Sequence, residues 1–246
     1  MYHLEFGLIE ISYSQISAFL GCPKRWWFSR QKDIHVARSA ALIYGNIFDQ
    51  ALSAILEGKQ TKAVEIFAAY LGNAANESGW NGQITYGKND SPPSIMLDWL
   101  DEAAKMVADK VGKPHALQLK LSRDFDSFRL VGVTDCILRG RIIDFKLTTE
   151  RFRPDPLQGC CYSLLNGGAT RFEFWAVLKG KIPQVRVIDV PETRNAQYLA
   201  WIVDCVLTPT AKAMQSGACP ANPSYQFCTK DYCSYWDICR RTGEIR

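Results

Sequence analysis

The sequence predicts an α/β fold in which helices pack against a β-sheet. Segments with the two-residue period of strands alternate with segments of helical period, in the order helices, hairpin, helix, hairpin, helix. Of the 246 residues, 47% are hydrophobic and 22% are charged, which is ordinary for a globular protein. This length suits one large domain or two small ones and is enough to bury a hydrophobic core.

The first third of the chain is predicted to be helical. A sequence that resembles a capping box begins a helix at Ser12, and a second helix begins at Pro23. Helical periodicity then covers residues 37–57 and 61–72. Residues 73–93 are rich in Asn, Gly and Ser, so we expect a surface loop there.

The first strands are expected in the middle of the chain. Residues 94–111 form an amphipathic pattern typical of a helix, and residues 116–126 can supply a strand. Two β-rich runs between Val131 and Thr149 flank Arg139-Gly140, which indicates a hairpin with a turn at that dipeptide.

The last third continues the alternation. Asp155 is the expected N-cap of a helix whose first residue is Pro156. A second hairpin is predicted over residues 171–178 and 184–190. A long helix then runs from about Thr193 to Gln215.

The first hairpin places two carboxylates and a lysine on one face. If its turn has two residues, Asp135 lies opposite Asp144, and Lys146 shares their face. Two carboxylates this close repel each other unless a cation lies between them, and a hard ion such as Mg²⁺ or Mn²⁺ prefers oxygen ligands. A lysine beside the ion can activate water and stabilise charge on a phosphate. The simpler alternative is a buried ion pair with one additional acid.

Three further polar positions lie on predicted helices. Gln158 and Tyr162 are four residues apart, so they share one helix face. Alone, that pair fits a plain helix with polar residues outward. Asp49 lies on the flank of the helix over 37–57, where a carboxylate is ordinarily just solvated.

A basic and aromatic cluster follows Pro23. Lys24, Arg25 and Trp26 are the residue types that bind phosphates and stack on bases. Trp26 and Trp27 can equally be core anchors with solvated charges around them.

The chain has nine cysteines, and its first ten residues, MYHLEFGLIE, do not have the pattern of a signal peptide. We therefore expect a reducing cytoplasmic location and metal ligation rather than disulfides. Cys228, Cys233 and Cys239 are spaced C-x4-C-x5-C and need a fourth ligand. Cys219 would complete a local site that suits zinc. Cys22 would join the two ends of the chain, in a site that suits zinc or an iron–sulphur cluster.

The overall charge and hydropathy leave the partner open. A formal net charge of +4 permits a nucleic-acid partner without requiring one. No apolar stretch reaches the length needed to span a membrane. The sequence has no GxxxxGK[ST] motif, so any unwinding of a duplex is expected from a partner.

In their order, these motifs resemble those of RecB-type nucleases of the PD-(D/E)xK superfamily. The similarity is greatest to the iron–sulphur exonucleases of the CRISPR-associated (fourth Cas family) kind, with their phage-borne and AddB-like relatives. It runs from about Ser12 to Cys239. The matching segments, in the family order, are Cys22-Pro23, Gly45 to Asp49 (G-x-x-x-H), Gly132 to Asp135 (G-x-x-D), Asp144 to Lys146 (D-x-K), Gln158 to Tyr162 (Q-x-x-x-Y) and Pro220 to Pro223 before the last cysteines.

The resemblance implies a restriction-endonuclease-like mixed sheet flanked by helices, in a single domain over 1–246. It implies that Asp135, Asp144 and the carbonyl oxygen of Phe145 bind Mg²⁺ or Mn²⁺. It further implies that Lys146 orients the attacking water and that Gln158 and Tyr162 steady the lysine and the DNA backbone. Asp49 stands where the family has a histidine and is the expected third ligand, because Asp is itself a hard ligand.

The resemblance also implies a [4Fe–4S] cluster on Cys22, Cys228, Cys233 and Cys239, held by the segments 12–31 and 219–241; zinc is the alternative metal. The expected activity is a metal-dependent DNA nuclease, an exonuclease on single strands or DNA ends. A structure-selective endonuclease, or an inactive DNA-binding module stabilised by zinc, is the alternative. Expected partners are DNA and a helicase, recombination or CRISPR adaptation protein.

Overall fold

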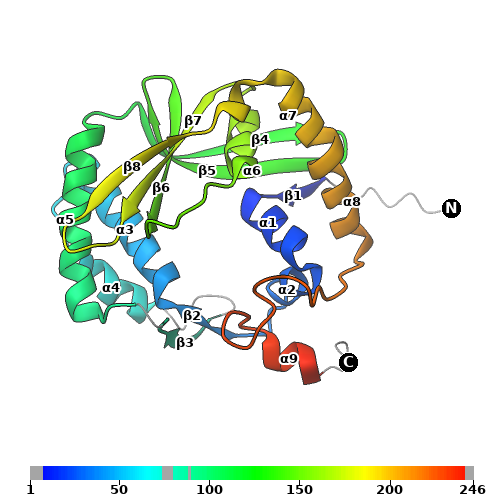
Figure 1. Cartoon of the computed structure of the whole chain (residues 1–246), viewed down its shortest axis with the longest axis horizontal. Helices are drawn as coiled ribbons and strands as arrows, with labels where there is room; N and C mark the ends of the chain where they lie inside the picture. Colours follow the sequence, from blue (N-terminus) through cyan, green and yellow to red (C-terminus); the bar gives the residue numbers. More distant parts are fainter. Residues whose placement is uncertain (1–7, 74–79, 88–89, 242–246) are drawn as a thin grey trace.

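The computed structural model describes residues 8–73, 80–87 and 90–241. Its centre is a six-stranded mixed sheet in the order β1-β5-β6-β7-β8, with β4 also paired to β5 (Figure 1). The pairs β1–β5 and β6–β7 are parallel, and the other three are antiparallel. The strands are β1 (Ile9–Ile11), β4 (Ala116–Phe125), β5 (Phe128–Leu138), β6 (Arg141–Thr148), β7 (Arg171–Leu178) and β8 (Gln184–Asp189). The α/β fold with a mixed central sheet is thus confirmed.

Helices cover both faces of the sheet. On one face α3 (Ala40–Leu56), α4 (Ala63–Gly72) and α5 (Pro93–Val111) pack against buried side chains of β5, β6 and β7. On the other face α1 (Tyr13–Gly21), α6 (Pro156–Leu165), α7 (Ala196–Ile202) and α8 (Thr208–Ser216) enclose a second core with β5. Along β6 and β7 alternate residues point to opposite faces, so both faces are buried and both strands read as nearly continuous apolar runs.

Several helices begin at the residues that the sequence predicts. Ser12 caps α1 by accepting the N–H of Gln15, and α2 (Pro23–Phe28) begins at its proline. Asp155 caps α6 by accepting the N–H of Leu157. The two predicted hairpins and the strand before them are also present.

Three short strands were not predicted. β1 pairs with β5 over only three residues, so no periodicity reveals it. β2 (Val36–Ser39) and β3 (Trp80–Thr85) form a separate parallel pair. The prediction of helix from residue 37 was therefore wrong over 37–39, and that of a surface loop over 73–93 was wrong over 80–85; residues 74–79 and 88–89 lie outside the described residues. Ser39 caps α3 and so delays the start of that helix to Ala40.

The predicted long helix over 193–215 is interrupted. A 3₁₀ turn (Pro191–Arg194) precedes α7, and a π-helical turn (Val203–Leu207) separates α7 from α8. Pro209 has no N–H and its ring would clash with the carbonyl of Cys205 in a regular helix. The wider turn, in which the N–H of Thr208 reaches the carbonyl of Val203, accommodates the proline.

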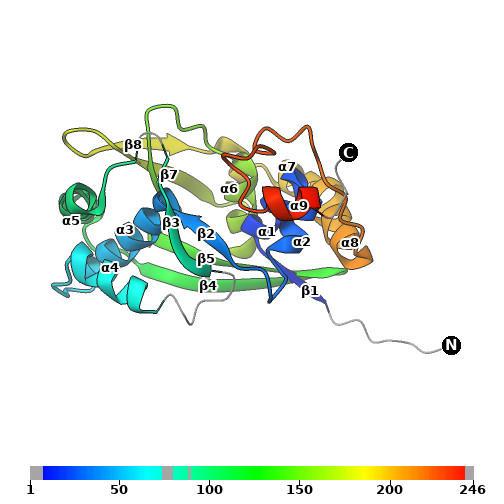
Figure 2. The ribbon, with the colours of Figure 1, turned by 90° about the horizontal axis from the view of Figure 1, so that it is seen from below.

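The two ends of the described chain are packed together. The C-terminal segment that leads to α9 (Trp236–Arg241) lies against α1 and α2 (Figure 2). The Lys24 N–H donates to the carbonyl of Pro220 over 3.1 Å, and Asn222 Nδ2 donates to the carbonyl of Gly21 over 2.9 Å. The rings of Phe28 and Tyr235 stack with centroids 5.6 Å apart. Within the described residues, no helix has both the length and the apolar character needed to cross a bilayer.

Candidate active site

The β5–β6 hairpin has the register that the sequence predicts. Leu138 pairs with Arg141 and Cys136 with Ile143 across a two-residue turn. Arg139 and Gly140 have φ angles of 49° and 75°, as a tight hairpin turn requires. Continued by one residue, this register places Asp135 opposite Asp144.

Each carboxylate of the hairpin is held by specific partners. Asp135 Oδ2 accepts the backbone N–H of Phe145 over 2.9 Å. Asp144 is only 4% exposed; Gln158 Nε2 donates to its Oδ1 over 2.6 Å, and Lys146 Nζ lies 2.6 Å from its Oδ2. Asp144, Lys146 and Gln158 thus form one contact network.

Asp49 lies close enough to this network to interact with it electrostatically. Burial, followed by the charges of Asp135 and Asp144, raises the pKa of Asp49 to about 8. Burial, followed by the charge of Asp135, raises the pKa of Asp144 to about 7. Burial also raises the pKa of Asp135, although the Phe145 N–H opposes this effect. Asp49 is half-buried, and these shifts place it near the two acids of the hairpin rather than alone on the helix flank.

The donor chemistry of this region fits a hard divalent cation. Three carboxylates with raised pKa values repel one another, and a cation between them would remove that repulsion. In the described part of the chain, no three His, Cys, Asp or Glu side chains converge as a ready metal site. Lys146 and Gln158 instead contact the oxygens of Asp144.

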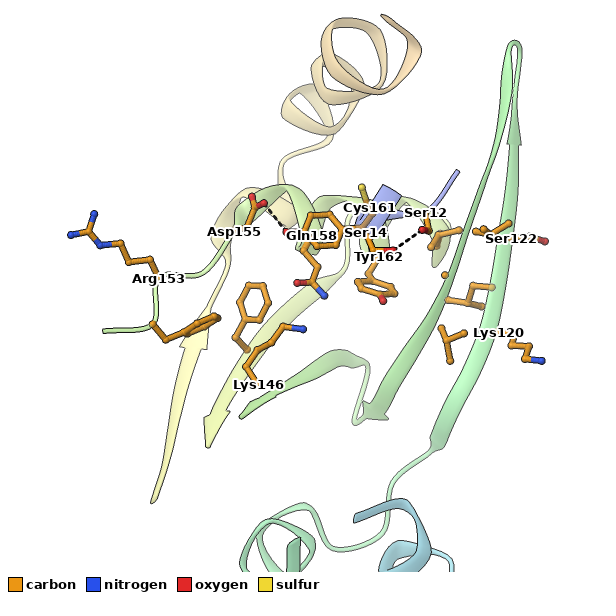
Figure 3. Close-up of a pocket in the computed structure, with 18 residues that line it drawn as sticks. Ser12, Ser14, Lys120, Ser122, Lys146, Arg153, Asp155, Gln158, Cys161 and Tyr162 are labelled. Atoms are coloured by element: carbon orange, nitrogen blue, oxygen red, sulfur yellow. Dashed lines mark hydrogen bonds between the residues drawn. The ribbon is translucent and has the colours of Figure 1, made fainter. Parts of the chain in front are cut away.

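A groove of about 880 Å³ opens beside the lysine. Lys146, Gln158 and Tyr162 point toward one another in it, whereas Lys120 and Arg153 lie at opposite ends (Figure 3). The remaining lining is mostly apolar and also includes Ser12, Tyr13 and Ser14. A chain of phosphates and bases could thus meet cations, hydroxyls and apolar side chains together.

Gly132 allows α6 to approach the sheet at this groove. A Cβ atom at this position would lie 2.8 Å from Leu165 Cδ1 and 3.1 Å from Tyr162 Cε1. The Tyr162 ring is also stacked on Phe172, with centroids 5.9 Å apart. The glycine and this stacking together fix where the Tyr162 hydroxyl enters the groove.

The family model of the PD-(D/E)XK nuclease superfamily matches residues 10–240. The chain belongs to this superfamily. The crystal structure of a "Putative exonuclease" from Eubacterium rectale is similar in fold, with a TM-score of 0.55 and 15% identity over 94% of this chain and 87% of that one. A second solved structure, SSO0001, has a TM-score of 0.40 and 14% identity over 91% and 96%. No curated protein matches the sequence.

In this PD-(D/E)XK nuclease, Cys22 lies beside the C-terminal cysteines. Its Sγ accepts the backbone N–H of Asn222 over 3.4 Å. Burial raises the pKa of Cys228, and the charges of Cys22 and Cys233 add to that effect. Cys239 is buried in the same C-terminal segment, and all nine cysteines are free thiols.

Cys219 has a different environment. Burial raises the pKa of its thiol, and the charge of Lys24 opposes that rise. Its side chain packs at the edge of the core between α1 and α8. Of the two candidate fourth ligands, Cys22 is the one whose charge acts on the Cys228 thiol.

The structure corrects the expectation for Trp26. Its side chain is 8% exposed and packs edge to face on Phe19, with centroids 5.2 Å apart. A base cannot stack on a ring that the core already covers, so Trp26 is a core anchor. Lys24 and Arg25 are half-buried, and Lys24 Nζ lies 4.5 Å from the ring centroid of Trp27.

The groove also contains residues that were not among the predicted site residues, among them Tyr13, Lys120, Arg153 and Asp155. Asp155 was identified only as an N-cap, yet its Oδ2 also accepts the hydroxyl of Tyr13 over 2.7 Å. Lys120 lies in the strand predicted over residues 116–126, but the sequence does not indicate which residues surround its side chain. These residues come together only through tertiary packing, which no local motif reports.

Proposed function

We propose that this PD-(D/E)XK nuclease is a metal-dependent DNA exonuclease that hydrolyses single strands or DNA ends. The observation that carries the proposal is the contact of Lys146 and Gln158 with Asp144 at the wall of a groove. This arrangement joins a buried acid, a cation and an amide donor where a phosphodiester can enter. A site with only a structural ion pair would not require such a groove.

Asp49, Asp135, Asp144 and the carbonyl oxygen of Phe145 would hold Mg²⁺ or Mn²⁺. When bound, the ion would polarise the phosphate and lower the pKa of a coordinated water. This ligand set is made of oxygen atoms alone, which suits these two ions better than softer metals. The mutual repulsion of the three acids supports the assignment, because binding would relieve it.

The side chains of Lys146, Gln158 and Tyr162 would orient the water, the acids and the DNA. Lys146 would leave Asp144 to orient the attacking water and to stabilise negative charge on the phosphate. Gln158 would keep Asp144 in place through its hydrogen bond. Tyr162 would steady the DNA backbone from the opposite wall. Lys24 and Arg25 are proposed to contact phosphates farther from the cleavage point.

The exonuclease assignment has two supports. The groove of about 880 Å³ is in the range of pockets that enclose one small ligand, which suits a single strand better than a duplex. The related fold from Eubacterium rectale carries the name of an exonuclease. We also propose that Cys22, Cys228, Cys233 and Cys239 hold a [4Fe–4S] cluster. The Asn222 N–H at Cys22 Sγ fits this role, since cluster sulphurs commonly accept such bonds.

The test uses a single-stranded DNA labelled at either the 5′ or the 3′ end, with Mg²⁺ or with a chelator. We expect Mg²⁺-dependent release of short products from one end, and none with Asp144→Asn protein of the same melting temperature. Internal cuts that produce a ladder from the start would favour an endonuclease. Binding of the strand without any cleavage would leave an inactive DNA-binding module and refute the proposal.

A further inference from the structure

The backbone of Gln118 is strained in the middle of β4. Its φ angle is 47°, in the left-handed region that side chains other than glycine seldom adopt and that costs free energy. The pairing of β4 with β5 keeps one register on both sides, with Leu117 opposite Cys136 and Leu119 opposite Thr134. The strain therefore brings no shift of the strand register, and another cause is needed.

That cause lies in the neighbours of Gln118. The same register places Gln118 opposite Asp135, where its side-chain amide can donate to the carboxylate and so lowers the pKa of Asp135. Gln118 also lines a second pocket of about 400 Å³ together with Asp49 and Gln50 of α3. It thus faces Asp135 across the strands and shares a pocket with Asp49, whereas Lys146 lines the separate groove described above.

We propose that Gln118 is a positioning residue that holds Asp135 in the orientation needed to bind the catalytic ion. The inference rests on the proposed function and deepens it, because it adds a residue outside the four motifs of the hairpin and helices. The Phe145 N–H fixes one oxygen of Asp135 from β6. The Gln118 amide supplies a hydrogen bond from the strand on the other side, so that both neighbouring strands hold the carboxylate.

A neutral amide is suited to this role. A lysine or arginine at position 118 would neutralise Asp135 and compete with a divalent ion for its charge. An amide orients the carboxylate and leaves its charge available. Loss of such a supporting hydrogen bond typically weakens metal affinity by about 10- to 100-fold.

The test compares two glycine substitutions at strained positions. Gln118→Gly removes the amide, while Arg139→Gly relieves a similar φ angle of 49° in the hairpin turn, away from the acids. Glycine adopts such angles freely, so neither variant should melt below the wild type. Calorimetric titration with Mn²⁺ should show about tenfold or weaker binding for Gln118→Gly and unchanged binding for Arg139→Gly.

Gln118→Asn tests whether the amide must reach Asp135, because it keeps the amide group on a shorter side chain. Asn tolerates the left-handed region, but its side chain is one methylene shorter. We expect it to melt like the wild type and to bind Mn²⁺ nearly as weakly as Gln118→Gly. In cleavage assays, both variants should need more Mg²⁺ for half-maximal rate and should recover at saturating Mg²⁺.

The inference would be overturned if both Gln118 variants bound Mn²⁺ with wild-type affinity. It would also fail if both variants lost melting temperature in proportion to affinity, because Gln118 would then have only a structural role. Asp135→Asn distinguishes this failure from failure of the proposed function. If the wild type binds Mn²⁺ and cleaves DNA, and only Asp135→Asn loses both, the function stands and the inference about Gln118 does not.

Discussion

At the scale of single residues, the site contains three acids, and the positive charge of Lys146 compensates only part of their negative charge. Asp144 is buried and its two oxygens contact Lys146 and Gln158. The pairing of Asp135 with Asp144 could be predicted, because a two-residue turn fixes which residues oppose each other. The proximity of Asp49 to these acids could not be predicted, since it depends on how α3 packs against the sheet.

Lys146→Ala should abolish cleavage and leave the fold intact. The lysine side chain is one-third exposed, so its loss removes charge stabilisation at the phosphate more than packing. We expect at least a 100-fold loss of rate, with wild-type circular dichroism and retained DNA binding. Gel-based cleavage assays measure the rate. Cleavage by purified Lys146→Ala protein at the wild-type rate would contradict the assignment.

The metal-free protein should lose stability as the pH rises. Because the pKa values of Asp49 and Asp144 are raised to about 8 and about 7, the native state holds their protons more tightly than the unfolded state does. This stabilisation is fully present below about pH 4 and is lost as the pH rises through 7 and 8. With a chelator present, the melting temperature should fall between pH 5.5 and pH 8.5.

The size and origin of that fall can be checked. A difference of one pKa unit corresponds to about 1.4 kcal/mol, or about 3–5 °C for a chain of this length. Asp49→Asn should flatten the profile, and Mg²⁺ at pH 8.5 should restore the melting temperature of the wild type. A metal-free protein that is equally stable across this range would show that the pKa values of Asp49 and Asp144 are not raised in the native state.

At the scale of elements, local signals predicted the long strands and the helix starts and missed what depends on distant partners. β1 is three residues long and exists because β5 offers a parallel edge. β2 pairs with β3, although α3 and α4 lie between the two strands in the sequence. The π-helical turn before α8 follows from Pro209, whose effect could have been recognised in the sequence.

Gly132→Ala should lower activity by displacing α6 from β5. The new Cβ would come within 3.1 Å of the Tyr162 ring, so the ring and its hydroxyl must move. Overpacking of this kind costs about 1–3 kcal/mol. We expect a lower melting temperature and a several-fold loss of cleavage rate. Gly72→Ala, at the end of α4 where no atom lies within 4 Å, is the control and should leave cleavage unchanged.

At the scale of the whole molecule, the ends of the described chain form one unit with the nuclease core. Cys22 follows directly on α1, whose first residue, Tyr13, bonds Asp155 at the groove. The C-terminal segment contacts the other end of the same helix through Asn222. Motif order predicted that the two ends would meet, but only the packing shows which atoms are in contact.

Cys22→Ser should lose iron and much stability, whereas Cys219→Ser should lose neither. A metal held between distant segments contributes directly to folding, because the unfolded chain does not preform the site. Anaerobically purified wild type should contain about four irons per chain. Iron analysis and thermal melts measure both effects. Stoichiometric zinc in place of iron, or the reverse pattern in the two variants, would favour the local zinc site.

Binding of single-stranded DNA should depend on salt, and Lys24 and Arg25 should contribute to that dependence. Phosphate contacts release counterions, so the affinity falls with ionic strength, by a slope of about 0.7 per contact on logarithmic axes. The double variant Lys24→Ala/Arg25→Ala should show a shallower slope in fluorescence anisotropy. An unchanged slope would indicate that this cluster faces away from the DNA.

The contacts between Asn222 and the end of α1 also set an order of events during synthesis. Gly21 and Asn222 are 201 positions apart, so a ribosome adding roughly 5–20 residues per second makes the partner about 10–40 s after the helix. During that interval Gly21 and Phe28 have no C-terminal segment to cover them. The nascent N-terminal helices must therefore wait for the last part of the chain, and a truncated product would expose this surface permanently.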